Sequence, residues 1–183
     1  MMIVIKKIIK KIIPTFIIDI INNFLNRICA FFTWNLWINH SYSQEGEDMV
    51  LKRIFSHQTN GFYIDVGAHH PMRFSNTYLF YKNKWRGINI DALPGSMKLF
   101  NKFRPRDINL ELGVGQKEEE LNYYMFNEPA LNSFSKELSE KRDRAQDLYF
   151  IKNIIKVEVK PLNKILDAHL TSSEIDFLNV DVE

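Results

Sequence analysis

The chain has 183 residues and a formal net charge of +2, with hydrophobic residues at 45% and charged residues at 25%. This composition is ordinary for one globular domain, and the small net charge gives no case for a nucleic-acid partner. Cys29 is the only cysteine, which excludes an intrachain disulfide and a thiolate metal cluster and fits a reducing compartment such as the cytoplasm.

The basic charge is concentrated in residues 1–40. This segment has five basic residues against Asp19 alone, or +4, whereas the remainder has 19 basic against 21 acidic residues, or −2. Isoleucines and lysines repeat with helical spacing over residues 1–13, and a second amphipathic stretch follows Pro14. We therefore predict an N-terminal amphipathic helical extension over residues 1–40, followed by a domain over residues 41–183.

Two interpretations of this extension stay open. In the first, it lies on the inner surface of an anionic membrane, with its lysines outward and Trp34 and Trp37 near the headgroups. In the second, its helices pack on the domain or on a second subunit. Asp19, Arg27 and several asparagines interrupt the apolar run, which argues against a spanning helix and against a secretory signal.

Helices and strands are expected to alternate after residue 41. A helix is predicted over residues 45–56, with Met49, Val50, Ile54 and Phe55 facing inward. Three strands, at FYIDV, RGINID and RDINLEL, alternate with helices over residues 76–82 and 94–103. This alternation is typical of an α/β fold with a mostly parallel sheet and right-handed crossovers.

The pattern is less regular beyond the third strand. Residues 119–126 are expected to form an edge strand, and residues 133–148 a helical or mobile excursion over the cofactor cleft. Gly113–Gly115 is interpreted as a turn. A strand and a helix are predicted in KVEVKPLNKILDAHL, and a fourth, buried strand in IDFLNVDVE.

Small and acidic residues follow the predicted strands at the sheet edge where open α/β sheets bind ligands. Gly67 and Ala68, just after Asp65, let the backbone turn tightly and approach a ligand. Asp91 ends the second strand, where a carboxylate can accept ribose hydroxyls. Glu111 ends the third, within reach of an adenine edge. The sequence lacks a GxGxxG motif, which favours a ligand without phosphates and leaves an NAD-type oxidoreductase as the weaker alternative.

Five sequence runs, in order, resemble the FkbM family of S-adenosylmethionine (SAM)-dependent methyltransferases: SYSQEGEDMVL, GFYIDVGAHHPMRFSNTYLFY, WRGINIDALPGS, RPRDINLELGVG and IDFLNVDVE. The resemblance covers essentially all of residues 41–183. It implies a Rossmann-like fold, SAM as cofactor, and O-methyl transfer to a sugar, polysaccharide or natural-product hydroxyl. By this resemblance Asp65, Gly67 and Ala68 match the first SAM motif, and Asp91, with the adjacent Ala92, matches the ribose-binding acid.

The resemblance also places Asp181 and Glu183 at the acidic end of the fourth strand, beside the methyl-transfer centre. O-methylation needs a base for the acceptor hydroxyl, and His69, Asp181 and Glu183 are the candidates. Gln44 either lies near the methionine carboxylate or the substrate, or serves with its acidic neighbours to open the following helix. The adjacent His69 and His70 are interpreted as loop residues that line the cofactor pocket, and no metal site is predicted.

The sequence is expected to contain only part of the fold that is typical of the family. In the family the strand that ends near Glu183 leads to further helices and strands, so the predicted sheet is incomplete at its C-terminal side. We therefore expect weak or no methyl transfer by this chain alone. The alternative function is a non-catalytic remnant that binds SAM without turnover.

Overall fold

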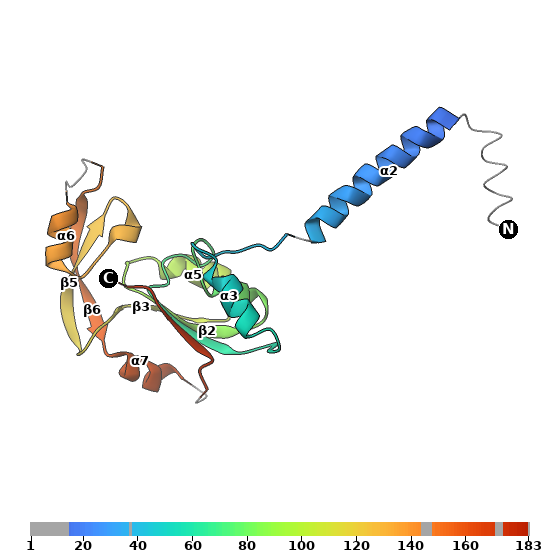
Figure 1. The fold of residues 1–183 in the computed structure, drawn as a ribbon. Helices are drawn as coiled ribbons and strands as arrows, with labels where there is room; N and C mark the ends of the chain where they lie inside the picture. Colours follow the sequence, from blue (N-terminus) through green and yellow to red (C-terminus); the bar gives the residue numbers. More distant parts are fainter. Residues whose placement is uncertain (1–14, 37, 144–147, 171–173, 183) are drawn as a thin grey trace. The chain divides into compact units, whose positions relative to one another are not determined.

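A computed structural model describes residues 15–36, 38–143, 148–170 and 174–182. The helix predicted over residues 1–13, Trp37 and Glu183 lie outside these ranges. The chain divides into two units, Met1–His40 and Ser41–Glu183. The first unit contains helix α2 (Thr15–Leu36), which matches the second amphipathic stretch (Figure 1). Over the described part of the chain, no helix combines the length and apolar character needed to cross a membrane.

A four-stranded sheet forms the centre of the second unit. All neighbouring strands are parallel, and their order is β3-β2-β1-β7. This confirms the predicted α/β fold with a mostly parallel sheet. The strands are β1 (Phe62–Val66), β2 (Arg86–Asp91), β3 (Ile108–Glu111) and β7 (Phe177–Val180). The helices that precede or connect the first three are α3 (Glu47–Ile54), α4 (Tyr78–Lys82) and α5 (Met97–Phe103).

The two faces of this sheet differ in chemistry. Isoleucine, valine and leucine side chains line one face, where Ile64 and Ile88 pack with Ile165 of helix α7 (Leu162–His169). The other face carries α3, α4 and α5, and its aromatic cluster contains Tyr63 and Trp85. Figure 1 shows α3 and α5 on one side of the sheet and α7 on the other. Two covered faces are what a parallel sheet requires, because both of its faces must be shielded from water.

A row of polar residues crosses the second face of the sheet at one register position. Asp65 pairs with Asn89 of β2 and with Asn179 of β7, and Asn89 pairs with Asn109 of β3. Asp65 and Asn89 are 2% and 0% exposed. Buried polar groups persist when they are hydrogen-bonded, so this row requires partners from the helices and loops above it.

A second, three-stranded sheet has the order β4-β6-β5. The predicted strand over residues 119–126 is confirmed as β5 (Glu119–Phe126), which pairs antiparallel with β6 (Ile151–Lys160) at the edge. The turn predicted at Gly113–Gly115 is wrong, because Gly113–Val114 form the short strand β4, parallel to the end of β6. Between β5 and β6 lie η1 (Pro129–Leu131) and α6 (Lys136–Arg142).

The predicted inner face of α3 is partly wrong. Phe55 packs against the aromatic cluster as expected, but Val50 and Ile54 are 62% and 66% exposed. The helix instead buries Asp48, whose carboxylate accepts hydrogen bonds from the Ser41 hydroxyl at 2.6 Å and the Tyr42 main-chain N–H at 2.7 Å. With Asp48 on its buried side, the helix presents Val50 and Ile54 to solvent.

The fourth strand is present as β7, but the prediction that it is buried is wrong. Leu178 and Val180 are 48% and 56% exposed. Both point to the same face as their partners Ile64 and Val66 in β1. Within the described residues β7 pairs only with β1, so it lies at the edge of the sheet and its apolar side chains are incompletely covered.

Candidate functional site

The strand order reverses between β1 and β7. The chain proceeds outward from β1 to β2 and β3, and later returns to the other side of β1 as β7. Open α/β sheets bind ligands beyond the carboxyl ends of the strands at such a point. Gly67 and Asp181 follow the two strands there, and the Asp181 N–H donates a hydrogen bond of 2.9 Å to the carbonyl oxygen of Val66.

Gly67 has a φ of +80°, a left-handed conformation that glycine adopts without steric cost. A Cβ atom at this position would also collide with the carbonyl oxygen of Asp181. The turn after β1 thus requires glycine both for its conformation and for the close approach of the β7 end. The predicted tight turn is confirmed, and its nearest neighbour is the backbone of Asp181.

The main-chain N–H groups of this turn already have partners within the protein. Gly67 and Ala68 donate to the carbonyl oxygen of Ile90 at 2.9 and 3.0 Å. His69 donates to Asp91 Oδ2 at 2.8 Å. Phosphate-binding turns work through N–H groups that are free to face the anion. This turn therefore lacks the free donors of a pyrophosphate-binding loop, in agreement with the absent GxGxxG motif.

Asp91 ends β2 beside this turn and orders the backbone on both sides of it. Its Oδ2 accepts from His69 N–H and its Oδ1 accepts from Leu93 N–H at 2.8 Å. Burial raises the pKa of this carboxyl, while the two main-chain N–H groups oppose that shift. Each carboxylate oxygen has two lone pairs, so each still has acceptor capacity for a ligand hydroxyl. Burial, together with the charge of Asp91, raises the pKa of Tyr123 in β5 to about 12.

Asp65 points into the protein interior. Its Oδ2 accepts from the Thr77 hydroxyl at 2.6 Å, and its Oδ1 accepts from Asn179 Nδ2 at 2.9 Å. Burial raises the pKa of Asp65, and the nearby Arg104 charge opposes this rise. The geometry makes Asp65 a residue that ties β1 to the start of α4 and to β7, and its contact with a cofactor stays a prediction.

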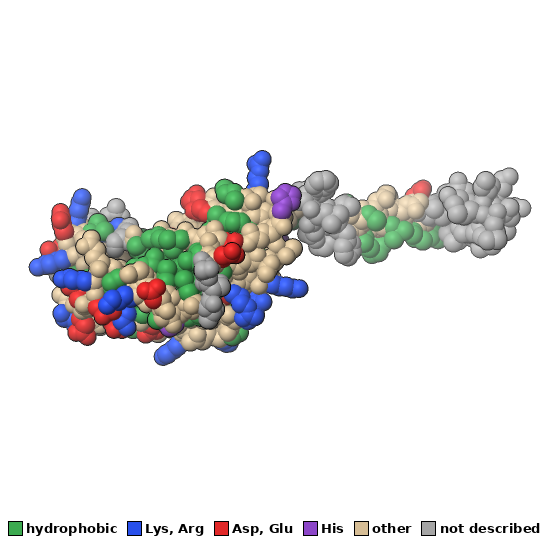
Figure 2. All heavy atoms as spheres, turned by 90° about the horizontal axis from the view of Figure 1, so that it is seen from below, with side chains coloured by type: hydrophobic (Ala, Val, Ile, Leu, Met, Phe, Trp, Pro, Cys, Tyr) green, Lys and Arg blue, Asp and Glu red, His purple; other side chains and the backbone are tan. Residues whose placement is uncertain are grey.

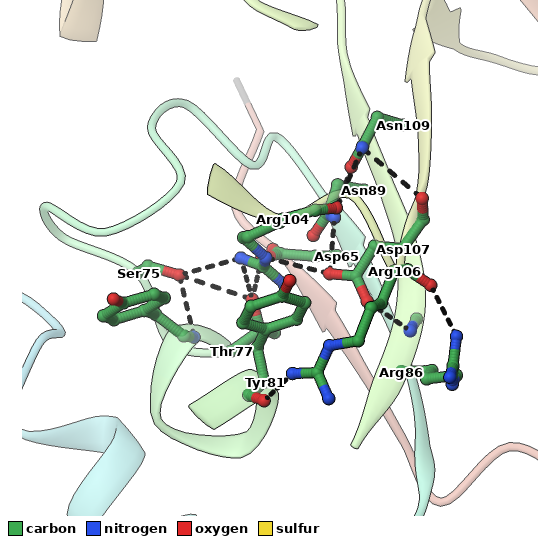
Figure 3. Close-up of polar contacts among 12 residues, drawn as sticks. Asp65, Ser75, Thr77, Tyr81, Arg86, Asn89, Arg104, Arg106, Asp107 and Asn109 are labelled. Carbon is green, nitrogen blue, oxygen red and sulfur yellow. Dashed lines mark hydrogen bonds and ion pairs between the residues drawn. The ribbon is translucent and has the colours of Figure 1, made fainter. Parts of the chain in front are cut away.

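Arg104 is the centre of the buried polar cluster above the sheet (Figure 3). It is 0% exposed, and its Nε donates to Asp107 Oδ2 at 2.9 Å. Its two terminal nitrogens donate to the Thr77 hydroxyl at 3.0 Å and to the Tyr63 hydroxyl at 2.6 Å. Burial alone lowers the pKa of Arg104, but the neighbouring Tyr63 and acidic groups raise it overall. The guanidinium therefore stays charged and links β1, α4 and the start of β3.

The remaining predicted cofactor residues lie around the ends of β1 to β3. Ala68 is 4% exposed and packs against helix α5, so its side chain faces the protein and only its backbone shapes the turn. Ala92 is half-buried directly after Asp91. Glu111 is exposed at the end of β3, and its Oε2 accepts from the Gly95 N–H at 2.8 Å. That bond fixes the loop after β2 against the end of β3.

The three candidate bases have different surroundings. His69 is half-buried with a φ of +53°, beside Asp91. Asp181 is exposed after β7, and its carbonyl oxygen lies against Gly67. Glu183 lies outside the described residues. The structure therefore places His69 within the glycine turn and the Asp181 backbone in contact with it.

His70 and Gln44 belong to segments that contact each other. His70 Nδ1 accepts from the main-chain N–H groups of Met72 and Arg73 at 3.1 and 3.0 Å. Burial lowers the pKa of His70, as do the charges of its neighbours. Gln44 is exposed in the segment before α3, and this segment meets the loop after β1 where Ser75 N–H donates to the Tyr42 carbonyl at 3.0 Å.

Sequence reasoning missed the residues that hold the site from within. Arg104, Asp107 and Asn179 were not singled out as residues of the site. One signal was available. In each of the four strands a polar residue comes directly before an apolar residue near the strand's end, as in Asp65-Val66. When the four strands are aligned on this pattern, their polar residues fall at one register position and form a row across the sheet.

The chain also has a cavity of about 450 Å³ whose walls contain none of the predicted site residues. It is bordered by α7 and by residues near β4, including the ion pair between Lys164 and Glu118 at 3.0 Å. The carboxyl ends of the strands, with the glycine turn and Asp91, remain the better supported site, because the chemistry of the residues agrees there with the topology.

Comparison with known families identifies this chain. The model of the methyltransferase FkbM domain matches residues 65–183, which is more than half of the chain and includes the glycine turn, Asp91 and β7. No curated protein and no solved structure matches the chain. The match begins at Asp65 and ends with the final residue, so it covers every strand after the start of β1. The chain belongs to the FkbM family of methyltransferases.

Proposed function

We propose that this chain binds SAM at the carboxyl ends of β1, β2 and β3 and transfers its methyl group to a hydroxyl of a sugar or related small molecule. The observation that carries the proposal is the hydrogen bonding of the turn after β1. The main-chain N–H groups of this turn already donate to Ile90 and Asp91, so they are not free to bind a phosphate. The turn therefore suits a ligand that has no phosphate there. Family membership supports methyl transfer as the reaction.

The residues present fit the adenosine part of SAM. Asp91 would accept the ribose hydroxyls with its remaining lone pairs, and Ala92 and Glu111 would border the adenine. The turn at Gly67 would border the methionine part, although the Asp181 carbonyl oxygen fills the space beside Gly67 itself. When bound, SAM supplies an electrophilic methyl group on a sulfonium.

The acceptor oxygen becomes a good nucleophile only as its proton leaves. We propose His69 or Asp181 as the proton acceptor, since His69 belongs to the turn after β1 and the Asp181 backbone contacts that turn at Gly67. The hydroxyl proton passes to that base, the oxygen–carbon bond forms, and the carbon–sulfur bond breaks. Sugar hydroxyls are the proposed acceptors because the family resemblance implies them.

Calorimetric titration with SAM and with NAD tests the cofactor. We expect SAM to bind and NAD not to bind, and Asp91→Asn to weaken SAM binding by roughly tenfold or more, because one charged acceptor is lost. Asp167→Asn, an exposed position that borders the separate cavity, is the matched control and is expected to bind SAM as the unmodified chain does. Binding of NAD in place of SAM would overturn the proposal.

Transfer of a labelled methyl group from SAM to sugar nucleotides and oligosaccharides tests the reaction. His69→Gln and Asp181→Asn are expected to differ in turnover. The variant that removes the base should lose turnover by about 10²–10⁴-fold, whereas its binding of SAM should be unchanged. Full activity in both variants would eliminate both as bases. SAM binding without transfer to any hydroxyl would support the remnant alternative over catalysis.

A further inference from the structure

Helix α2 has an apolar half and a polar half. Its 22 residues make a rod about 33 Å long. With 3.6 residues per turn, the apolar positions fall within about half of the circumference. They are Phe16, Ile17, Ile20, Ile21, Phe24, Leu25 and Ile28, and their exposed fractions are 36–64%. Figure 2 shows the apolar side chains along one edge of this helix, with polar and acidic ones on the opposite edge.

The polar half is almost uncharged. Asp19 and Arg27 are the only charged residues of α2, and the polar half otherwise presents asparagines such as Asn22 and Asn26. Arg27 lies at the margin of the apolar half, where its long stem can follow an apolar surface while its head stays in water. Coiled-coil partners instead use a narrow apolar seam flanked by paired opposite charges. A wide apolar half with few flanking charges is typical of a helix that lies in a lipid interface.

The charge of the preceding segment indicates the kind of lipid. Four lysines, Lys6, Lys7, Lys10 and Lys11, precede α2, and the +4 charge of residues 1–40 contrasts with the −2 of the remainder. Lysines next to an amphipathic helix are attracted to anionic headgroups. The matched family region begins at residue 65, so methyl transfer does not account for this segment.

We propose that residues 1–36 bind the surface of an anionic membrane, with the apolar half of α2 buried in the headgroup region and the lysines on the lipid phosphates. This surface attachment is independent of the proposed methyl transfer. It places the methyltransferase unit beside the membrane, where it can reach acceptors that are carried on lipids or processed at the bilayer.

Co-sedimentation of the full chain with vesicles tests the attachment. The probes are vesicles of phosphatidylcholine alone and of phosphatidylcholine mixed with phosphatidylglycerol. We expect binding to the mixed vesicles that weakens as salt is raised. Replacing Ile20 and Phe24 by Asn, or all four lysines by Gln, should each weaken binding by roughly tenfold or more.

The matched control replaces Asn22 and Asn26 by Gln on the polar half, and it should bind vesicles as the unmodified chain does. Thermal unfolding of the second unit should be unchanged in all variants, which separates loss of binding from loss of folding. Equal binding to both vesicle types would overturn the proposal, as would undiminished binding by the variant in which Asn replaces Ile20 and Phe24. The unmodified chain could instead self-associate without binding vesicles, and lose this self-association when Asn replaces Ile20 and Phe24. That result would assign the apolar half to a second copy of the chain and would also overturn the proposal.

Discussion

A side chain on Gly67 would collide with the carbonyl oxygen of Asp181. The two residues follow β1 and β7, the neighbouring strands between which the strand order reverses. The close approach means that the turn after β1 and the end of β7 cannot be arranged independently. Any ligand at this edge of the sheet therefore meets a surface whose shape depends on a single glycine.

Gly67→Ala is expected to lower the free energy of unfolding by about 2–5 kcal/mol. A left-handed conformation costs an alanine roughly 1–2 kcal/mol, and overpacking against a fixed backbone typically costs about 1–3 kcal/mol more. Urea denaturation followed by circular dichroism measures the change. We also expect SAM binding to be lost, because relief of the collision displaces the turn or the end of β7.

Gly46→Ala is the matched control for this substitution. Gly46 has a φ of +92°, yet a Cβ there would have no atom within 4 Å. Its cost should be about 1–2 kcal/mol, from conformation alone. If the two alanine variants were equally stable, the contact between Gly67 and Asp181 would not be a rigid constraint.

Thr77→Val should destabilise the protein by about 1–3 kcal/mol. The hydroxyl donates to Asp65 and accepts from Arg104, so its removal leaves two buried polar groups each without one partner. Thr77→Ser retains the hydroxyl and should recover most of the loss. Thr59→Val, at an exposed position, should change stability by about 0.5 kcal/mol or less. Chemical denaturation of the three variants decides, and equal stability of the two valine variants would contradict the role of Thr77.

Arg104→Met should cost about 3–5 kcal/mol, because it leaves Asp107 buried without its ion-pair partner. Arg104→Lys is not expected to restore stability, since an ammonium cannot reproduce the forked set of bonds. Arg106→Met is the control: Arg106 is exposed, and its guanidinium lies 4.2 Å from the centre of the Tyr81 ring. Thermal melting that shows a similar loss in both Met variants would contradict a central role for Arg104.

The strands and the glycine turn were predictable because local patterns determine them. Apolar runs such as FYIDV mark buried parallel strands, and a small pair after the first strand marks the tight turn. The order of elements along the chain then indicates parallel pairing. The site could be located from sequence for the same reason, since the carboxyl ends of parallel strands share one edge of the sheet.

Features that depend on long-range contacts were not predictable in this way. The inner face of α3 was misassigned because apolar periodicity cannot anticipate that Asp48 is buried and satisfied by Ser41 and Tyr42. Likewise Arg104 looks like a surface residue in sequence. Its burial depends on hydrogen-bond partners that are distant in sequence, such as Thr77 and the hydroxyl of Tyr63.

Stability should depend on pH through Asp65. Burial raises the pKa of this carboxyl in the folded protein above the ordinary value of 3.8, although the Arg104 charge opposes the rise. The folded state therefore holds the Asp65 proton more tightly than the unfolded state. Its favourable contribution is complete below the ordinary pKa and is lost as pH rises through the raised pKa.

Asp65→Asn cannot ionise, so it lacks this pH-dependent contribution. The unfolding free energy of the unmodified chain minus that of Asp65→Asn should fall as pH rises from about 4 and then level off above the raised pKa. Altered hydrogen bonds to Thr77 and Asn179 add an offset, but a neutral amide makes that offset independent of pH. Urea denaturation of both proteins across this range measures the difference. A difference that stays flat, or that grows with pH, would mean that the folded protein does not raise the pKa of Asp65. The internal cluster would then stabilise the charged form of Asp65 as fully as water does.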